Sequence, residues 1–107
     1  MVRILVALLV LFSVGIQHAW ATDAANGRNI ARQCSVCHGK TGVANDPEVP
    51  NLAGQSAFYI EKSLKDFREG ARADDRMSLM AEALSDGEIE DLAAWYASIE
   101  VTVTAPE

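Results

Sequence analysis

Three residues in one short segment have the types and the spacing needed to hold a cofactor. Cys34 and Cys37 are separated by two residues, and His38 follows directly, which gives the pattern C-x-x-C-H. This pattern is the attachment site of a c-type haem. The two thiols can add across the two vinyl groups on one porphyrin edge, and the next residue then lies under the iron, where its imidazole can bind. We therefore predict that these three residues hold one haem.

Other uses of these side chains need partners that the sequence does not offer. A structural zinc site takes four ligands, but residues 22–107 contain two cysteines and one histidine. A redox-active cysteine pair of the thioredoxin type needs strands alternating with helices, and no convincing strand pattern is visible. A disulfide between Cys34 and Cys37 would close a very small loop and leave a small apolar core unexplained. Haem attachment is the favoured hypothesis.

The second axial ligand of the iron can be sought in the same way. Residues 22–107 contain no further histidine and two methionines, Met77 and Met80. Met80 is in phase with the apolar residues of a predicted short helix, where core packing is the default role of methionine. Met77 precedes Ser78, the predicted N-cap of that helix, at the end of a polar loop that can lie over the haem. We predict His38 and Met77 as the axial ligands, with Met80 or an open sixth position as the alternatives.

A histidine ligand also needs a hydrogen-bond acceptor that fixes its tautomer. Pro50 lies twelve residues after His38 and offers a carbonyl oxygen without a competing N–H. We predict that the Pro50 carbonyl accepts the proton on His38 Nδ1. Gln55, Tyr59 and Arg76 are candidate partners of the haem propionates, but residues of these types are more often ordinary surface or core residues, and they stay outside the predicted site.

Four helices are expected to position these side chains. They begin at or just after four residues that can cap a helix N-terminus: Asp23, Ser56, Ser78 and Ser85. The first helix is expected to continue to Cys34, with Gly27, Ile30, Ala31 and Cys34 on one face. The second helix is expected to end at Gly70, and the last opens with a capping box that ends at Glu88. Residues 39–54 are rich in glycine, asparagine, aspartate and proline and are predicted to form a loop. From about residue 100 we expect a loose tail.

The first 21 residues differ in composition from the rest. Sixteen of them are apolar and one is charged. The apolar stretch Ile4–Ile16 is too short to span a bilayer comfortably, and it is followed by Ala19-Trp20-Ala21, a small-x-small cleavage pattern. These features predict a secretory signal peptide over residues 1–21, cleaved after Ala21, with an uncleaved anchor as the alternative. Residues 22–107 would then be a single domain without a transmembrane segment, exported to the periplasm.

Charge and core size limit the function of residues 22–107. They carry 15 acidic and eight basic side chains, a formal charge of −7, and all of the net charge falls in residues 77–107. Such a chain has no basic patch that could displace counterions, which excludes nucleic acid as a partner.

Apart from alanine and cysteine, only 21 of these 86 residues are apolar, which is a small core for one domain. A porphyrin would fill it.

The sequence resembles a class I cytochrome c over nearly all of residues 22–107. It is similar to the small bacterial type, such as cytochrome c553 and one half of the dihaem cytochrome c4. The matching segments are Gly27–Cys34, CSVCHG, PNLAGQ with Tyr59 after it, FREGAR, the Met77-x-x-Met80 pair and LSDGEIEDLAAWYAS. The resemblance implies an all-α fold with about four helices wrapped around one covalent haem c. It also implies that Gly27 lets the first and last helices cross closely, with Ile30 meeting Leu92 and Trp95, and that Met77 is the sulfur ligand.

The resemblance also implies a function. It points to a periplasmic one-electron carrier, not an enzyme, that meets redox partner proteins transiently, and we expect a monomer. A dedicated haem c subunit of a periplasmic dehydrogenase complex is the alternative. A gas-binding or catalytic haem protein with an open sixth position is a third hypothesis.

Overall fold

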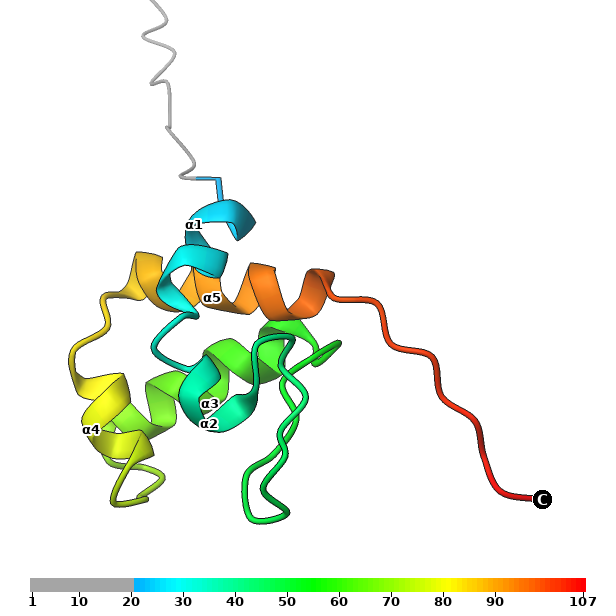
Figure 1. The fold of residues 1–107 in the computed structure, drawn as a ribbon. Coiled ribbons are helices and arrows are strands. Elements are labelled where there is room, and N and C mark those ends of the chain that lie inside the picture. Colours follow the sequence, from blue (N-terminus) through cyan, green and yellow to red (C-terminus); the bar gives the residue numbers. More distant parts are fainter. Residues whose placement is uncertain (1–20) are drawn as a thin grey trace, which may run out of the picture.

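Helices alone make up the regular structure of residues 21–107, the part of the chain that the computed structural model describes (Figure 1). The predicted signal peptide, apart from Ala21, lies outside these residues. In chain order the helices are α1 (Ala24–Ile30), α2 (Ser35–His38), α3 (Ala57–Glu69), α4 (Met77–Glu82) and α5 (Asp86–Ser98). The predicted all-α class is confirmed.

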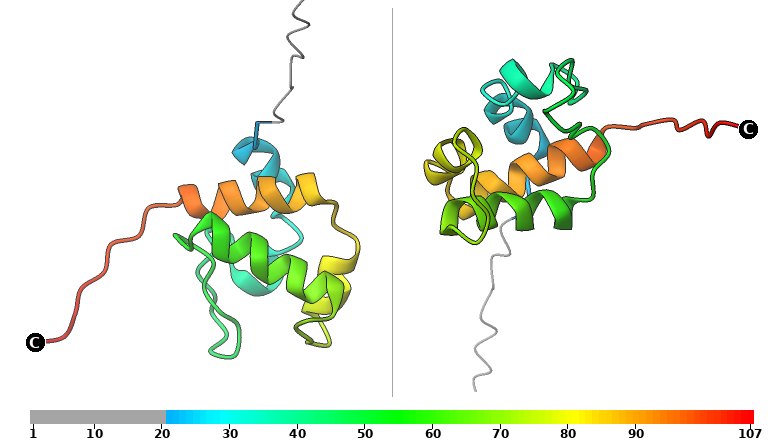
Figure 2. Two further views of the ribbon diagram at one scale, coloured as in Figure 1. Left: turned by 180° about the vertical axis from the view of Figure 1, so that it is seen from behind. Right: turned by 90° about the horizontal axis from the view of Figure 1, so that it is seen from below.

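The last helix, α5, is the centre of the fold. Helix α1 packs against one side of it and α3 against another, while α4 packs against α3 (Figures 1 and 2). Ile89 and Leu92 of α5 are almost completely buried. The core cluster around them is small, as expected from the composition: Ala31, Ile60, Leu84, Ile89, Leu92, Ala93 and Tyr96.

The crossing of α1 and α5 depends on Gly27. A Cβ atom at this position would lie 2.0 Å from the carbonyl oxygen of Asp91, so only glycine allows the two backbones to come this close. The Asp91 carboxylate joins the same two helices, because it accepts hydrogen bonds from the backbone N–H of Asp23 at 2.7 Å and from Asn26 Nδ2 at 2.8 Å. Ile30 packs against the same core as Leu92 and Trp95. The close approach implied by the resemblance is confirmed.

Side-chain caps begin three of the helices as predicted. The Asp23 carboxylate accepts from Asn26 N at 3.0 Å, and Ser56 Oγ accepts from Tyr59 N at 3.2 Å. Ser85 and Glu88 form both bonds of the capping box. Gly70 ends α3 with a φ of 84°, a left-handed conformation that glycine adopts without strain.

The first predicted helix is wrong in its extent. It does not continue to Cys34, because α1 ends at Ile30 and a turn over residues 31–34 separates it from α2. The turn is held by bonds between residues three apart, such as Cys34 N to the Ala31 carbonyl at 3.0 Å. Bonds of this kind wind the chain more tightly than an α-helix. Residues 21–107 therefore contain five helices rather than the four predicted.

The predicted cap of the short helix is also wrong. Helix α4 begins at Met77, one residue before Ser78. Asp74 takes the capping role, since its Oδ1 accepts from Arg76 N at 2.9 Å and from Met77 N at 2.8 Å. The Ser78 hydroxyl instead accepts from Asp74 N at 3.1 Å. A carboxylate at a helix start accepts the free N–H groups and interacts favourably with the helix dipole.

Removing this cap is expected to destabilise the fold in a pH-dependent way. The N–H groups of Met77 and Arg76 lower the pKa of Asp74. The folded-state pKa of Asp74 is below the unfolded value of about 3.9. The ionised Asp74 carboxylate therefore stabilises the fold above about pH 3.9, and this stabilisation is lost as the pH falls through the folded-state pKa. We expect Asp74→Ala to lower the melting temperature at pH 7, with the difference from wild type shrinking below about pH 4.

Asp75→Ala is the matched control, because it removes a neighbouring carboxylate that caps no helix. Equal melting temperatures for the Asp74 and Asp75 variants at pH 7 would contradict the assignment of Asp74 as the cap.

The chain after α5 has no regular secondary structure. Residues 100–107 are exposed and extend away from the helices (Figure 1), as expected for a loose tail. Among residues 21–107, no helix combines the length and the apolar character that crossing a bilayer requires.

Candidate haem site

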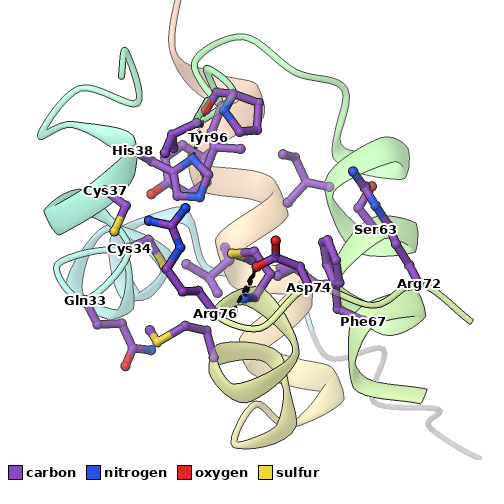
Figure 3. Close-up of a pocket in the computed structure, with 18 of the residues that line it drawn as sticks. Gln33, Cys34, Cys37, His38, Ser63, Phe67, Arg72, Asp74, Arg76 and Tyr96 are labelled. Atoms are coloured by element: carbon purple, nitrogen blue, oxygen red, sulfur yellow. Dashed lines mark hydrogen bonds between the residues drawn. The ribbon is translucent and has the colours of Figure 1, made fainter. Parts of the chain in front are cut away.

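A cavity of about 740 Å³ lies between α2, α3, α4 and α5. This volume is within the range of cofactor pockets. The cavity brings together every residue that was predicted in the site or weighed as a ligand: Cys34, Cys37, His38, Pro50, Met77 and Met80. Figure 3 labels Cys34, Cys37 and His38 at this cavity.

The turn before α2 and the helix itself present the C-x-x-C-H segment to the cavity. Cys34 N donates to the Ala31 carbonyl, and His38 N donates to the Cys34 carbonyl at 3.0 Å. Neither cysteine is in a disulfide within residues 21–107; Cys37 is on the surface and Cys34 is partly buried. Burial raises the pKa of the Cys34 thiol.

His38 is buried, with 5% of its surface exposed. Its Nδ1 lies 2.8 Å from the Pro50 carbonyl oxygen, the pair that the sequence analysis expected to be joined. A carbonyl oxygen only accepts, so the proton of the neutral ring is on Nδ1 in this contact. Nε2 then carries the lone pair that can bind a metal.

The loop over residues 39–54 is folded so that Pro50 faces His38. The Gly42 carbonyl accepts from Leu52 N at 2.7 Å and from Ala53 N at 3.0 Å. Gly42 has a φ of 79°, and a Cβ atom there would lie 2.8 Å from Ala53 N. A side chain at this position would therefore force the two arms of the loop apart.

The two methionines lie on one short helix. Met77 and Met80 are both partly buried, both line the cavity, and they are three residues apart, which places them on the same face of α4. The expectation that a loop carries Met77 is wrong, since Met77 is the first residue of α4. Both methionines therefore lie on the helix, and both sulfurs remain available as ligands.

Comparison with known proteins identifies the family. Residues 22–95 match the family model described as cytochrome C oxidase, cbb3-type, subunit III. The chain is 46% identical over 83 residues to cytochrome c-554(548) of Halomonas halodenitrificans, a match that covers 75% of this chain and all of that protein. The chain belongs to the class I cytochromes c. This cytochrome is also 38% identical over 102 residues to cytochrome c4 of Pseudomonas aeruginosa, a match that covers 94% of this chain and 50% of that protein.

A solved structure supports the same assignment. Reduced recombinant cytochrome c4 from Pseudomonas stutzeri superposes on this cytochrome with a TM-score of 0.66 and 36% sequence identity, covering 72% of this chain and 48% of that chain. The cytochrome thus spans about half the length of the cytochromes c4 that it matches and the whole of cytochrome c-554(548).

The described residues of this cytochrome fit a covalent haem. The cavity walls are mainly apolar, and two thiols and a buried imidazole line the same space. The apolar wall residues come from α3, α5 and the segments that precede these two helices: Leu52, Ile60, Leu64, Phe67, Leu84 and Leu92. Gln55, Tyr59 and Arg76 also line the cavity.

Sequence reasoning missed one polar group of this site. The Tyr96 ring belongs to the core cluster. Its hydroxyl, however, is buried at the cavity and has no hydrogen-bond partner among residues 21–107. Burial raises the pKa of Tyr96 well above its ordinary value, and the neighbouring Cys34 thiol adds to this. A tyrosine at a helical apolar position carries no sequence signal for such a role.

Proposed function

We propose that this cytochrome is a periplasmic one-electron carrier with a single haem c, attached through Cys34 and Cys37 and ligated by His38 and Met77. The observation that carries the proposal is the convergence of both thiols and the His38 imidazole on one apolar cavity of about 740 Å³. The haem iron supplies the one-electron chemistry. The export predicted from residues 1–21 supports the periplasmic location.

The protein side chains would do three things for the haem. The two cysteines hold it in one orientation through two thioether bonds. The Pro50 carbonyl, 2.8 Å from His38 Nδ1, keeps Nε2 free to bind iron and holds the ring in place. A methionine sulfur that bound the iron would favour the ferrous form and raise the reduction potential. Because the same ligands serve both oxidation states, little reorganisation would oppose electron transfer.

Partner access is supported by the surface near α2 and α4. Val36 and Leu79 line the cavity and are 85% and 69% exposed, and Cys37 is exposed beside them. A porphyrin attached at Cys37 would therefore have one edge near the surface. Redox partners generally dock through small interfaces and separate quickly, which suits a carrier that meets its partners transiently.

Size-exclusion chromatography of the native protein, followed by its haem absorbance, tests whether the carrier is free. A free monomeric carrier elutes at the size of one chain of 86 residues, the expected length after export. Elution of all haem absorbance with a dehydrogenase would instead support the subunit hypothesis.

The choice between the two sulfur ligands is tested by a pair of variants. We expect Met77→Ala to abolish the methionine-to-iron absorption band of the oxidised protein and to let carbon monoxide bind the reduced haem readily. Met80→Ala should retain the band, because it leaves the proposed sulfur ligand unchanged. Loss of the band in Met80→Ala alone would assign the ligand to Met80, and absence of the band in the wild type would support an open sixth position.

A further inference from the structure

The unpartnered hydroxyl of Tyr96 lies in the wall of the haem cavity. Tyr96 is 3% exposed, and its hydroxyl oxygen is buried. Tyr96 lines this cavity together with Cys34 and His38 (Figure 3). A buried hydroxyl without a partner costs free energy, so the phenol gains by donating to an acceptor in the completed site.

The position of this phenol is set by its surroundings. The Tyr96 carbonyl accepts from Gly54 N at 3.0 Å, which fixes the end of the loop over residues 39–54 on α5. A Cβ atom at Gly42 would lie 3.2 Å from Tyr96 Cδ1, so the backbone of the same loop packs against the ring. The ring thus has little room to move away from the cavity.

The candidate acceptor for this hydroxyl is the sulfur of Cys34. Cys34 lines the same cavity and packs against the core cluster to which the Tyr96 ring belongs. An isolated tyrosine is protonated at neutral pH and so has a proton to donate. A thiol can donate as well as accept, whereas a thioether sulfur has lost its hydrogen and can only accept. Attachment of a porphyrin to Cys34 would therefore make the Tyr96 hydroxyl the donor and the Cys34 sulfur the acceptor.

We propose that the Tyr96 hydroxyl donates a hydrogen bond to the Cys34 thioether sulfur and thereby raises the reduction potential of the haem. This proposal rests on the proposed function, because it needs the haem to be attached at Cys34. The positive end of the O–H dipole would point at an atom bonded directly to the porphyrin edge. In a low-dielectric site such a dipole favours the state with the extra electron. Tyr96 would be a positioning residue that acts on the haem through Cys34.

The test is the reduction potential of the haem-loaded Tyr96→Phe variant. Phenylalanine keeps the ring and removes only the hydroxyl, so we expect a lower midpoint potential and an unchanged methionine-to-iron band. Ser98→Ala is the control, since it removes a hydroxyl from the same helix that bonds to the Trp95 carbonyl outside the cavity, and it should leave the potential unchanged. A purely structural role of the hydroxyl would alter the melting temperature without altering the potential.

The direction of the shift decides the question. An unchanged or higher potential in Tyr96→Phe would overturn the proposal. If the hydroxyl only made the pocket more polar, its removal would raise the potential. In a Cys34→Ala background, with the haem held by Cys37 alone, Tyr96→Phe should have no effect, and a persisting shift would also overturn it. If that background does not retain haem, the shift in Tyr96→Phe alone decides. Failure of the proposed function can be told apart from failure of this proposal, because the wild type would then carry no haem.

Discussion

Replacing both Cys34 and Cys37 with alanine is expected to abolish covalent haem binding and to prevent formation of a compact native state. The chain buries few large apolar side chains around a cavity of about 740 Å³. Cavities of this kind reduce stability roughly in proportion to their volume, and a domain of this size has only a few kcal/mol of net stability to lose. The haem would supply the missing core. Haem staining of a denaturing gel and the cooperativity of thermal unfolding measure the two effects.

Val36→Ala is the matched control for this experiment. It changes a residue between the two cysteines whose side chain is 85% exposed, so haem staining and cooperative unfolding should both persist. A double cysteine variant that unfolds cooperatively at the wild-type temperature would show that the haem is not part of the core.

The second large effect is expected from Gly27→Ala, at the crossing of α1 and α5. The added Cβ would lie 2.0 Å from the Asp91 carbonyl oxygen and 2.9 Å from Trp95 Cβ. Neither backbone can give way without separating the helices, so we expect a loss of about 3 kcal/mol of unfolding free energy, the upper end of the usual cost of overpacking. Denaturant unfolding of the haem-loaded protein measures it.

Gly87→Ala makes the same substitution at a site with space. Gly87 lies in the first turn of α5, and a Cβ there would meet no atom within 4 Å. Alanine is the better helix former, so this variant should gain about 0.5 kcal/mol. Equal effects of the two substitutions would contradict the close crossing of α1 and α5.

Much of the fold could be predicted from residues whose effect is local. Asp23, Ser56 and Ser85 can bond only to N–H groups two or three residues ahead, so their capping roles follow from the sequence nearby. The close crossing at Gly27 came from the resemblance to a family, because its partner Asp91 is 64 residues away in the chain. The meeting of both thiols and His38 at one cavity could be predicted, because the haem attachment that we propose dictates their spacing.

The differences arise where several local choices compete. Asp74, Asp75 and Ser78 can all cap a helix, and Asp74 is selected because its carboxylate reaches the N–H groups of both Arg76 and Met77. The break after Ile30 rests on bonds between residues three apart, which leave no periodic pattern in the sequence. The Tyr96 ring packs against the loop over residues 39–54, and its hydroxyl is buried at the cavity; both are tertiary effects.

The mass of the exported polypeptide tests the central claim most directly. We expect residues 22–107 to carry the added mass of one haem, and neither Cys34 nor Cys37 to react with a thiol reagent after denaturation. A polypeptide of unmodified mass with both thiols reactive would contradict the claim that this chain is built around a covalent haem.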